Sequence, residues 1–235
     1  MSLPVAILVG GLAMRLRPLT EEIPKALIPI NGRPFLAHQL ELLKDKGIQD
    51  VVICAFYRGE QIEDFAGDGR RFGLNICYSY DGPQPLGTGG AVRKALPLLG
   101  EAFFVLYGDS YLPIDYESVE ESFNVSEKDA LMTVYRNRDQ GDRSNIQYEN
   151  GKILAYNKVN RTKEMEFIDY GLGAFKRSAI EAFPENEILD LAKVYQVLLI
   201  ADRLAAFEVK QRFYEVGSFE GIRELEAYLK QEKGD

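Results

Sequence analysis

The sequence has few cysteines, which limits what they can do in this protein. Only Cys54 and Cys77 occur among 235 residues. Each lies in an apolar, β-rich stretch, and neither has a partner at metal-ligand spacing. We therefore expect two buried thiols in a reducing cytosol.

Surplus positive charge and long apolar runs are also absent. The net charge is −8, which argues against a general nucleic-acid binder, because phosphate neutralisation needs an excess of Lys and Arg. No segment reaches the length of a membrane span, and the first residues lack the charged region of a secretory signal. We therefore expect a cytoplasmic protein with neither a nucleic acid nor a membrane as partner.

Apolar strand-like runs alternate with amphipathic helix-like runs in the first half of the chain. The pattern predicts strands at 4–9, 50–56, 74–80, 102–109 and 130–136, and helices at 34–47, 59–67, 89–99 and 115–123. Continuous apolar strands separated by helices favour a mostly parallel sheet that is covered on both faces.

The second half is more mixed. Residues 145–158 predict a hairpin around Asn150-Gly151, a strong signal for a tight turn. Further strands are expected at 168–175, 204–209 and 212–217, and helices at 187–203 and 219–233. We therefore predict an α/β fold: a Rossmann-like three-layer sandwich with a mostly parallel mixed sheet and a small antiparallel lobe, in one domain over residues 1–235.

The stretch AILVGGLAMRLRPLTEEIPKALIPI, residues 6–30, follows the first predicted strand. Such loops lie at the carboxyl edge of a parallel sheet, where these folds bind ligands. Gly10 and Gly11 would let the backbone approach a ligand and adopt positive φ, and Arg15, Arg17 and Lys25 would supply charge for phosphates. A plain surface turn with solvated arginines is the alternative. The spacing fits neither the G-x-x-x-x-G-K-[ST] loop nor the G-x-G-x-x-G fingerprint.

GGLAMRLRPLTEEIPKALIPINGRPFL resembles the signature of the sugar-1-phosphate nucleotidyltransferases, G-G-x-G-T-R-L-x-P-L-T followed by P-K-x-L, with Ala13 and Met14 in place of Gly and Thr. The resemblance continues almost throughout the chain. Its other segments are PLGTGGAVRKAL (85–96), LYGDS (106–110), ILAYNK (153–158), IDYGLGAF (168–175) and RFYEVG (212–217). Within the family, the chain is most similar to short guanylyltransferases for mannose or heptose 1-phosphates.

The resemblance implies attack of a sugar 1-phosphate on the α-phosphorus of a nucleoside triphosphate, with release of pyrophosphate. This nucleophile is already ionised at neutral pH, so no strong general base is needed, and the one histidine, His38, is expected to be structural. Catalysis then depends on positioning and charge neutralisation. Arg15 is expected to stabilise the leaving pyrophosphate and Lys25 to reach the α-phosphate.

The resemblance also implies the remaining site residues. Asp109 and Glu215 would hold Mg²⁺. Residues 1–135 would bind the nucleotide, through Leu8, Gly10, Gly11, Arg15, Lys25, Asp81, Gly87 and Thr88. From the residues themselves, the backbone of Gly82, Gly87 and Gly89 would contact the base edge, with a plain Pro/Gly loop as the alternative. Residues 136–235 would bind the sugar 1-phosphate. Its expected contacts are Gly108, Lys158 for the phosphate, and Asn145, Asp169 and the backbone of Gly171 for the hydroxyls.

Each assignment has an ordinary structural alternative. Asp109 would then be a helix N-cap and Glu215 a solvated carboxylate at a strand end. Asn145 and Asp169 would be polar groups of a hairpin and a strand.

The substrates also remain open. Uridylyl transfer to an amino-sugar 1-phosphate and cytidylyl transfer to phosphocholine compete with the guanylyl reaction. The departures from the family pattern also allow a non-catalytic regulatory protein that binds nucleotide sugars. Expected partners are a nucleoside triphosphate and a sugar 1-phosphate, in a monomer or homodimer. No hexapeptide repeat is visible, so we predict no second activity.

Overall fold

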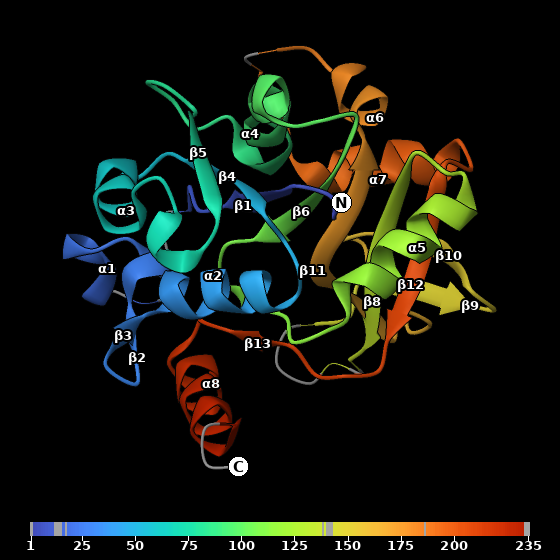
Figure 1. The fold of residues 1–235 in the computed structure, drawn as a ribbon. Helices are drawn as coiled ribbons and strands as arrows, with labels where there is room; N and C mark the ends of the chain where they lie inside the picture. Colours follow the sequence, from blue (N-terminus) through green and yellow to red (C-terminus); the bar gives the residue numbers. More distant parts are fainter. Residues whose placement is uncertain are drawn as a thin grey trace.

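One mixed sheet forms the centre of the protein (Figure 1). The computed structural model describes residues 2–11, 16, 18–137, 139, 143–185 and 187–232. Within those ranges the central sheet has nine strands. Seven of them follow one another in the order β10 (Lys152–Tyr156), β9 (Ile146–Glu149), β11 (Phe167–Lys176), β6 (Ala102–Tyr107), β1 (Val5–Leu8), β4 (Asp50–Ala55) and β5 (Asn75–Tyr80). The other two are β8 (Ala130–Arg136), which pairs with β11, and β12 (Leu204–Val209), which pairs with β8. The parallel part consists of β1 (Val5–Leu8), β4 (Asp50–Ala55), β5 (Asn75–Tyr80) and β6 (Ala102–Tyr107).

The apolar strands are buried on both faces, as a parallel sheet requires. In β1, Val5 and Ile7 pack into one core cluster and Ala6 packs into another. The same alternation holds in β6, where Phe104 joins the first cluster and Phe103 the second. Because neighbouring side chains of a strand point to opposite faces, each strand contributes to both layers of the core.

Helices cover both faces of the sheet (Figure 1). On the first face lie α2 (Phe35–Asp45), α3 (Gly59–Ala66) and α5 (Tyr116–Ser126). On the second face lie α4 (Gly87–Ala95), α6 (Arg177–Glu181) and α7 (Leu191–Ile200). Asp115 caps α5 by accepting from the backbone N–H of Glu117 and of Ser118.

The second half adds the antiparallel strands. Strand β11 (Phe167–Lys176) pairs antiparallel with β6, with β8 (Ala130–Arg136) and with β9 (Ile146–Glu149). Strands β9 and β10 (Lys152–Tyr156) form the predicted hairpin. Asn150 and Gly151 have φ of 49° and 81° there, as a type I′ turn requires. The predicted fold class is therefore confirmed.

The smaller elements support the edge of the sheet that carries the site. Strand β12 (Leu204–Val209) extends the sheet beyond β8, β7 (Ser110–Tyr111) pairs with β13 (Tyr214–Glu215), and β2 (Pro29–Ile30) pairs with β3 (Arg33–Pro34). Helices α1 (Leu19–Glu22) and α8 (Phe219–Glu232) complete the set, with 3₁₀ helices at Lys25–Leu27, Arg70–Phe72 and Leu96–Leu98. Helix α8 lies apart from the sheet, next to β13 (Figure 1).

Two expectations about the fold are wrong. The helix predicted over 187–203 begins only at Leu191, because Asp190 caps it, and residues 187–189 are not helical. Cys54 is buried, as expected, but Cys77 is exposed, because it lies on β5, the edge strand of the sheet. In the described ranges, no helix is both long and apolar enough to span a bilayer.

Candidate active site

Two adjoining cavities open at the carboxyl ends of the parallel strands. The larger, of about 530 Å³, contains nine predicted site residues: Leu8, Gly10, Gly11, Lys25, Asp81, Gly87, Thr88, Gly108 and Asp109. The smaller, of about 200 Å³, contains six: Asp109, Asn145, Lys158, Asp169, Gly171 and Glu215. Tyr107 and Asp109 line both cavities. The predicted residues therefore gather as two groups that share a wall, and Arg15 and Arg17 lie outside the described residues.

Close backbone packing explains two of the glycines in the larger cavity. A Cβ on Gly108 would lie 2.3 Å from the carbonyl oxygen of Leu8, and a Cβ on Gly10 would lie 3.1 Å from Cβ of Phe56. The N–H of Gly108 donates to that same oxygen of Leu8, at 3.0 Å. Neither Gly10 nor Gly11 has positive φ, so that expectation is wrong. At Gly10 the requirement is proximity to a neighbouring strand end rather than left-handed backbone.

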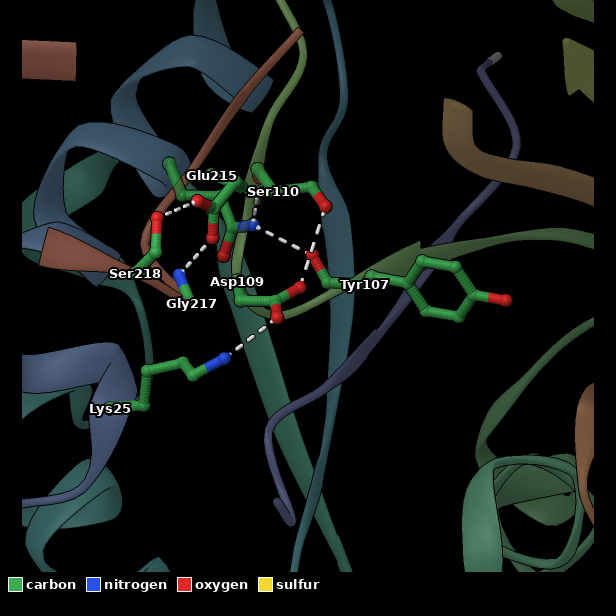
Figure 2. Close-up of polar contacts among 8 residues, drawn as sticks. Lys25, Tyr107, Asp109, Ser110, Glu215, Gly217 and Ser218 are labelled. Carbon is green, nitrogen blue, oxygen red and sulfur yellow. Dashed lines mark hydrogen bonds and ion pairs between the residues drawn. The ribbon is translucent and has the colours of Figure 1, made fainter. Parts of the chain in front are cut away.

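An ion pair joins the two predicted catalytic residues of the larger cavity. Nζ of Lys25 lies 2.7 Å from Oδ2 of Asp109, and Figure 2 shows the lysine reaching across to the carboxylate. Lys25 begins a 3₁₀ helix after Pro24, whereas Asp109 follows β6 and precedes strand β7. Because no helix starts after Asp109, the alternative role as a helix N-cap is excluded.

The turn before α4 forms the far wall of the larger cavity. Asp81 is buried, and its Oδ2 accepts from the N–H of Leu86 at 2.8 Å. Burial raises the pKa of this carboxyl group. Gly87 has φ of 74°, a conformation that favours glycine. The N–H of Gly89 donates to the carbonyl of Leu189 at 2.8 Å, so this N–H is engaged within the protein.

Asp190 is a residue that the sequence analysis missed. Its Oδ1 accepts from Thr88 Oγ1 at 3.2 Å and lies 3.8 Å from Nζ of Lys158, so it touches one lining residue of each cavity. It also caps α7 by accepting from the N–H of Ala192 at 2.8 Å. A helix N-cap was the one signal available in the sequence, and it carries no information about these longer-range contacts.

Asp169 is held in the wall of the smaller cavity by two hydrogen bonds. Its Oδ2 accepts from Tyr107 Oη at 2.9 Å, and its Oδ1 accepts from the N–H of Gly171 at 3.0 Å. Pairing of β11 with β8 shifts register between Asp169 and Gly173, and Gly171 has φ of 105° within this irregularity. Burial raises the pKa of Asp169. It is therefore more than an ordinary exposed strand residue.

Glu215 is ordered by the start of α8. Its carboxylate accepts from the N–H of Gly217, and from Oγ of Ser218 at 2.5 Å. Figure 2 shows these contacts beside Asp109. The N–H of Val216 donates to the carbonyl of Asp109 at 2.9 Å. Glu215 is therefore not simply solvated, because a helix N-terminus stabilises a carboxylate there.

Few of the described side chains that line the two cavities could coordinate a metal ion. Among the residues that the structure describes, no three His, Cys, Asp or Glu side chains are grouped as metal ligands. Asp109 and Glu215 both line the smaller cavity, because Glu215 lies on β13 and Asp109 directly precedes β7, the strand with which β13 pairs. Two carboxylates completed by phosphate oxygens and water are a donor set that Mg²⁺ accepts, so these residues fit that ion.

The hydrogen-bond partners of Asn145 and His38 distinguish a cavity residue from a structural one. Oδ1 of Asn145 is buried and accepts no hydrogen bond from any described residue, and its N–H donates to the carbonyl of Phe167 at 2.9 Å. His38 lies on α2, where its Nε2 is 2.9 Å from the carbonyl oxygen of Ile30, and it lines neither cavity. His38 therefore has the structural role that was expected.

The sequence matches a known family. Residues 5–150 match the model of the family described as Nucleotidyl transferase. Among curated relatives, the chain is 43% identical over 114 residues to the N-acetylmuramate alpha-1-phosphate uridylyltransferase of Neisseria meningitidis, which covers 47% of this chain and 48% of that protein. It is 39% identical over 114 residues to the D-glycero-alpha-D-manno-heptose 1-phosphate guanylyltransferase of Campylobacter jejuni, with 48% and 51% covered.

A longer match reaches the UTP–glucose-1-phosphate uridylyltransferase of Synechocystis, at 28% identity over 225 residues, 88% of this chain and 58% of that protein. The chain thus spans about half to three-fifths of the length of these curated relatives.

Solved structures show the same fold. The structure of HddC from Yersinia pseudotuberculosis complexed with GMP-PN has a TM-score of 0.80 at 23% identity, covering 97% of this chain and 99% of that one. A putative glucose-1-phosphate thymidylyltransferase from Bacillus anthracis has a TM-score of 0.84 at 20% identity, covering 96% and 94%.

Proposed function

The chain belongs to the nucleotidyl transferase family, and from this premise we propose that it joins a nucleoside triphosphate to a sugar 1-phosphate, giving a nucleotide sugar and pyrophosphate. The observation that carries the proposal is the pair of adjoining cavities with Tyr107 and Asp109 in their common wall. A transfer between two phosphorylated substrates needs such a shared boundary, where the reacting atoms meet.

The charges in the two cavities suit that reaction. The phosphate oxygen of the sugar 1-phosphate attacks the α-phosphorus, the bond to the β-phosphate oxygen breaks, and pyrophosphate leaves. Lys25, in the larger cavity, neutralises charge at the α-phosphate, and Lys158, in the smaller one, holds the incoming phosphate. Arg15 stays our proposed partner for the leaving pyrophosphate.

A divalent cation belongs to the same proposal. Asp109 and Glu215 would hold Mg²⁺, which supplies positive charge against the triphosphate when it is bound. Because Lys25 already pairs with Asp109, binding of the substrates requires the lysine to exchange its carboxylate partner for a phosphate. Changing Asp109 to Asn is expected to abolish Mg²⁺-dependent turnover.

The preferred base and sugar are guanine and a mannose- or heptose-type ring. Asp81 supports guanine, because a buried carboxylate in the wall of the larger cavity can accept from the N1–H and N2–H₂ donors on one edge of that base. Uracil presents a single N3–H between two carbonyl oxygens, and these oxygens are repelled by a carboxylate. Relatives named for heptose 1-phosphate and mannose 1-phosphate guanylyl transfer support the sugar.

Pyrophosphate release tests the proposal. GTP, UTP, CTP, ATP and dTTP would each be combined with mannose, heptose, glucose and N-acetylmuramate 1-phosphates and with phosphocholine, in the presence of Mg²⁺. We expect the strongest rate with GTP and a mannose- or heptose-type 1-phosphate. Binding of a nucleoside triphosphate without pyrophosphate release from any combination would instead indicate a non-catalytic regulatory protein.

A further inference from the structure

The smaller cavity contains more negative than positive side chains. Three carboxylates line it, from Asp109, Asp169 and Glu215, and Lys158 is the one cation among the described residues of its wall. Under the proposed function, Lys158 is engaged by the phosphate of the sugar substrate. The rest of the sugar would then face a wall without free positive charge from any described residue.

The three carboxylates differ in how their charge is compensated. Asp109 has Lys25 at 2.7 Å, and Glu215 faces the N-terminal turn of α8 through Gly217 and Ser218. Asp169 is hydrogen-bonded by neutral donors, the hydroxyl of Tyr107 and the N–H of Gly171. Lys158 acts on Asp169 through space but makes no ion pair with it, so the negative charge of Asp169 is the least neutralised of the three once the sugar phosphate engages Lys158.

We propose, resting on the function proposed above, that the smaller cavity selects sugar 1-phosphates whose ring substituents are uncharged, and that Asp169 excludes sugars carrying a carboxylate. Two like charges in a poorly hydrated site repel each other strongly, and neither can recover its lost hydration. A carboxylate on the sugar would meet this penalty, because Lys158 and the Mg²⁺ proposed at Asp109 and Glu215 would both be engaged by phosphate groups. Specificity then comes from rejection of one class of sugar as well as from attraction of the other.

The same wall offers acceptors to hydroxyl groups. Oδ1 of Asn145 is buried and unpaired within the described ranges, and each oxygen of Asp169 accepts one protein hydrogen bond and has capacity for another. A hydroxyl donates to such oxygens, whereas a carboxylate has no proton to donate. An uncharged, hydroxyl-bearing sugar is therefore the complementary ligand.

Matched pairs of sugars test this inference. Mannose 1-phosphate differs from mannuronic acid 1-phosphate only at carbon 6, as glucose 1-phosphate does from glucuronic acid 1-phosphate. N-Acetylglucosamine 1-phosphate and N-acetylmuramic acid 1-phosphate form a third pair, and a neutral heptose 1-phosphate completes the panel. With Mg²⁺ and each of the five nucleoside triphosphates, we expect kcat/KM for every carboxylate-bearing sugar to be at least about tenfold below that of the best neutral sugar.

The variant Asp169→Asn removes the charge and keeps a side chain of the same shape. We expect it to reduce the ratio of kcat/KM between the neutral and the carboxylate-bearing sugar of a pair by about tenfold. The change should come mainly from a lower KM for the carboxylate-bearing sugar. Asp64→Asn is the matched control, because Asp64 is exposed on α3, outside both cavities. It removes the same charge and should leave this ratio unchanged.

The outcomes separate the two proposals. A carboxylate-bearing sugar used within tenfold of the best neutral one would overturn the inference and leave the nucleotidyl transfer intact. An unchanged ratio in folded Asp169→Asn would overturn the role of Asp169. No turnover of any sugar with any triphosphate would overturn the proposed function, and the inference with it. If Asp169→Asn does not fold, the wild-type comparison decides the selectivity by itself.

Discussion

The two cavities are built in different ways. The larger is formed by backbone at the ends of β1 and β6 and by the turn before α4, where Gly10, Gly87 and Gly108 allow close approach. The smaller depends on side chains, with Asp169 from an irregular antiparallel strand and Glu215 from a short strand near the C-terminus. A backbone site is sensitive to added volume, whereas a side-chain site is sensitive to lost charge and hydrogen bonds.

This contrast matches the chemistry that we propose for each side. A triphosphate carries many equivalent oxygens, which backbone N–H groups and a lysine can bind without distinguishing one nucleotide from another. Sugars differ in the position and charge of their substituents, and only placed side chains can read such differences. Variation between related enzymes should therefore spare the triphosphate contacts of the larger cavity and concentrate at its base contact and in the smaller cavity.

Loss of the positive charge in the larger cavity should have the largest effect. Lys25→Ala is expected to lower kcat/KM by roughly a thousandfold, because the lysine stabilises charge that develops at the α-phosphate. Lys230→Ala, on the exposed side of α8, is the control and should retain wild-type rates. Steady-state measurement of pyrophosphate release checks both variants, and near-normal turnover in Lys25→Ala would remove this residue from the mechanism.

Added volume in the backbone site should show next, as lost stability. Gly108→Ala would place a methyl group 2.3 Å from the carbonyl oxygen of Leu8, and neither backbone segment can yield easily within the sheet. We expect it to lower the free energy of unfolding by about 3 kcal/mol. Gly11→Ala is the matched control, since nothing lies within 4 Å of its added Cβ. Urea denaturation of both variants measures the difference, and equal midpoints would contradict the packing argument.

If each cavity binds one of the two substrates, a change in one cavity should alter KM for one substrate only. Lys158→Ala is expected to raise KM for the sugar 1-phosphate by more than about tenfold while KM for the nucleotide changes little. Lys158 lies only in the smaller cavity. Initial rates over a two-dimensional range of both substrates give the two constants. A parallel rise of both would indicate that the cavities are not the separate sites that we describe.

The smallest effect concerns pH, where two aspartates should respond in opposite directions. Burial raises the pKa of Asp169, so in the folded protein it takes up a proton at higher pH than it does in the unfolded chain. Its destabilising effect therefore fades as pH falls through that raised pKa. The hydroxyl of Ser118 lowers the pKa of Asp115, so the stability that Asp115 contributes is lost as pH falls through the lowered pKa.

Melting temperatures over a pH series check this pair. On acidification, the melting temperature of wild type should rise by about 2 °C relative to that of Asp169→Asn. It should fall by a smaller amount relative to that of Asp115→Asn. The sign follows because the asparagine variants do not titrate. Melting curves of wild type and Asp169→Asn that stay parallel at every pH would mean that Asp169 does not titrate differently in the two states.

The sequence predicted the elements around the larger cavity more completely than those around the smaller one. An apolar strand ending at Gly10-Gly11, and a second ending at Gly108-Asp109, place both loops at one edge of a parallel sheet, because parallel strands share their carboxyl edge. The hairpin at Asn150 was equally accessible, since its turn chemistry is local.

The remaining features depend on contacts between distant segments. Asp190 reaches Thr88, more than a hundred residues away in the chain. The carbonyl of Leu189 occupies the N–H of Gly89, which the sequence pattern left free. Cys77 is exposed because β5 lies at the edge of the sheet. The composition of a single strand does not predict its position in the sheet. Local patterns predict elements, and tertiary contacts decide how their polar groups are used.

The most direct test of the account follows both products in one reaction. Pyrophosphate and nucleotide sugar would be measured together, with Mg²⁺, from GTP alone and from GTP with mannose or heptose 1-phosphate. We expect equal amounts of the two products, formed only when both substrates are present and lost in Asp109→Asn. Pyrophosphate formed from GTP alone at the same rate, without nucleotide sugar, would contradict transfer between two adjoining sites.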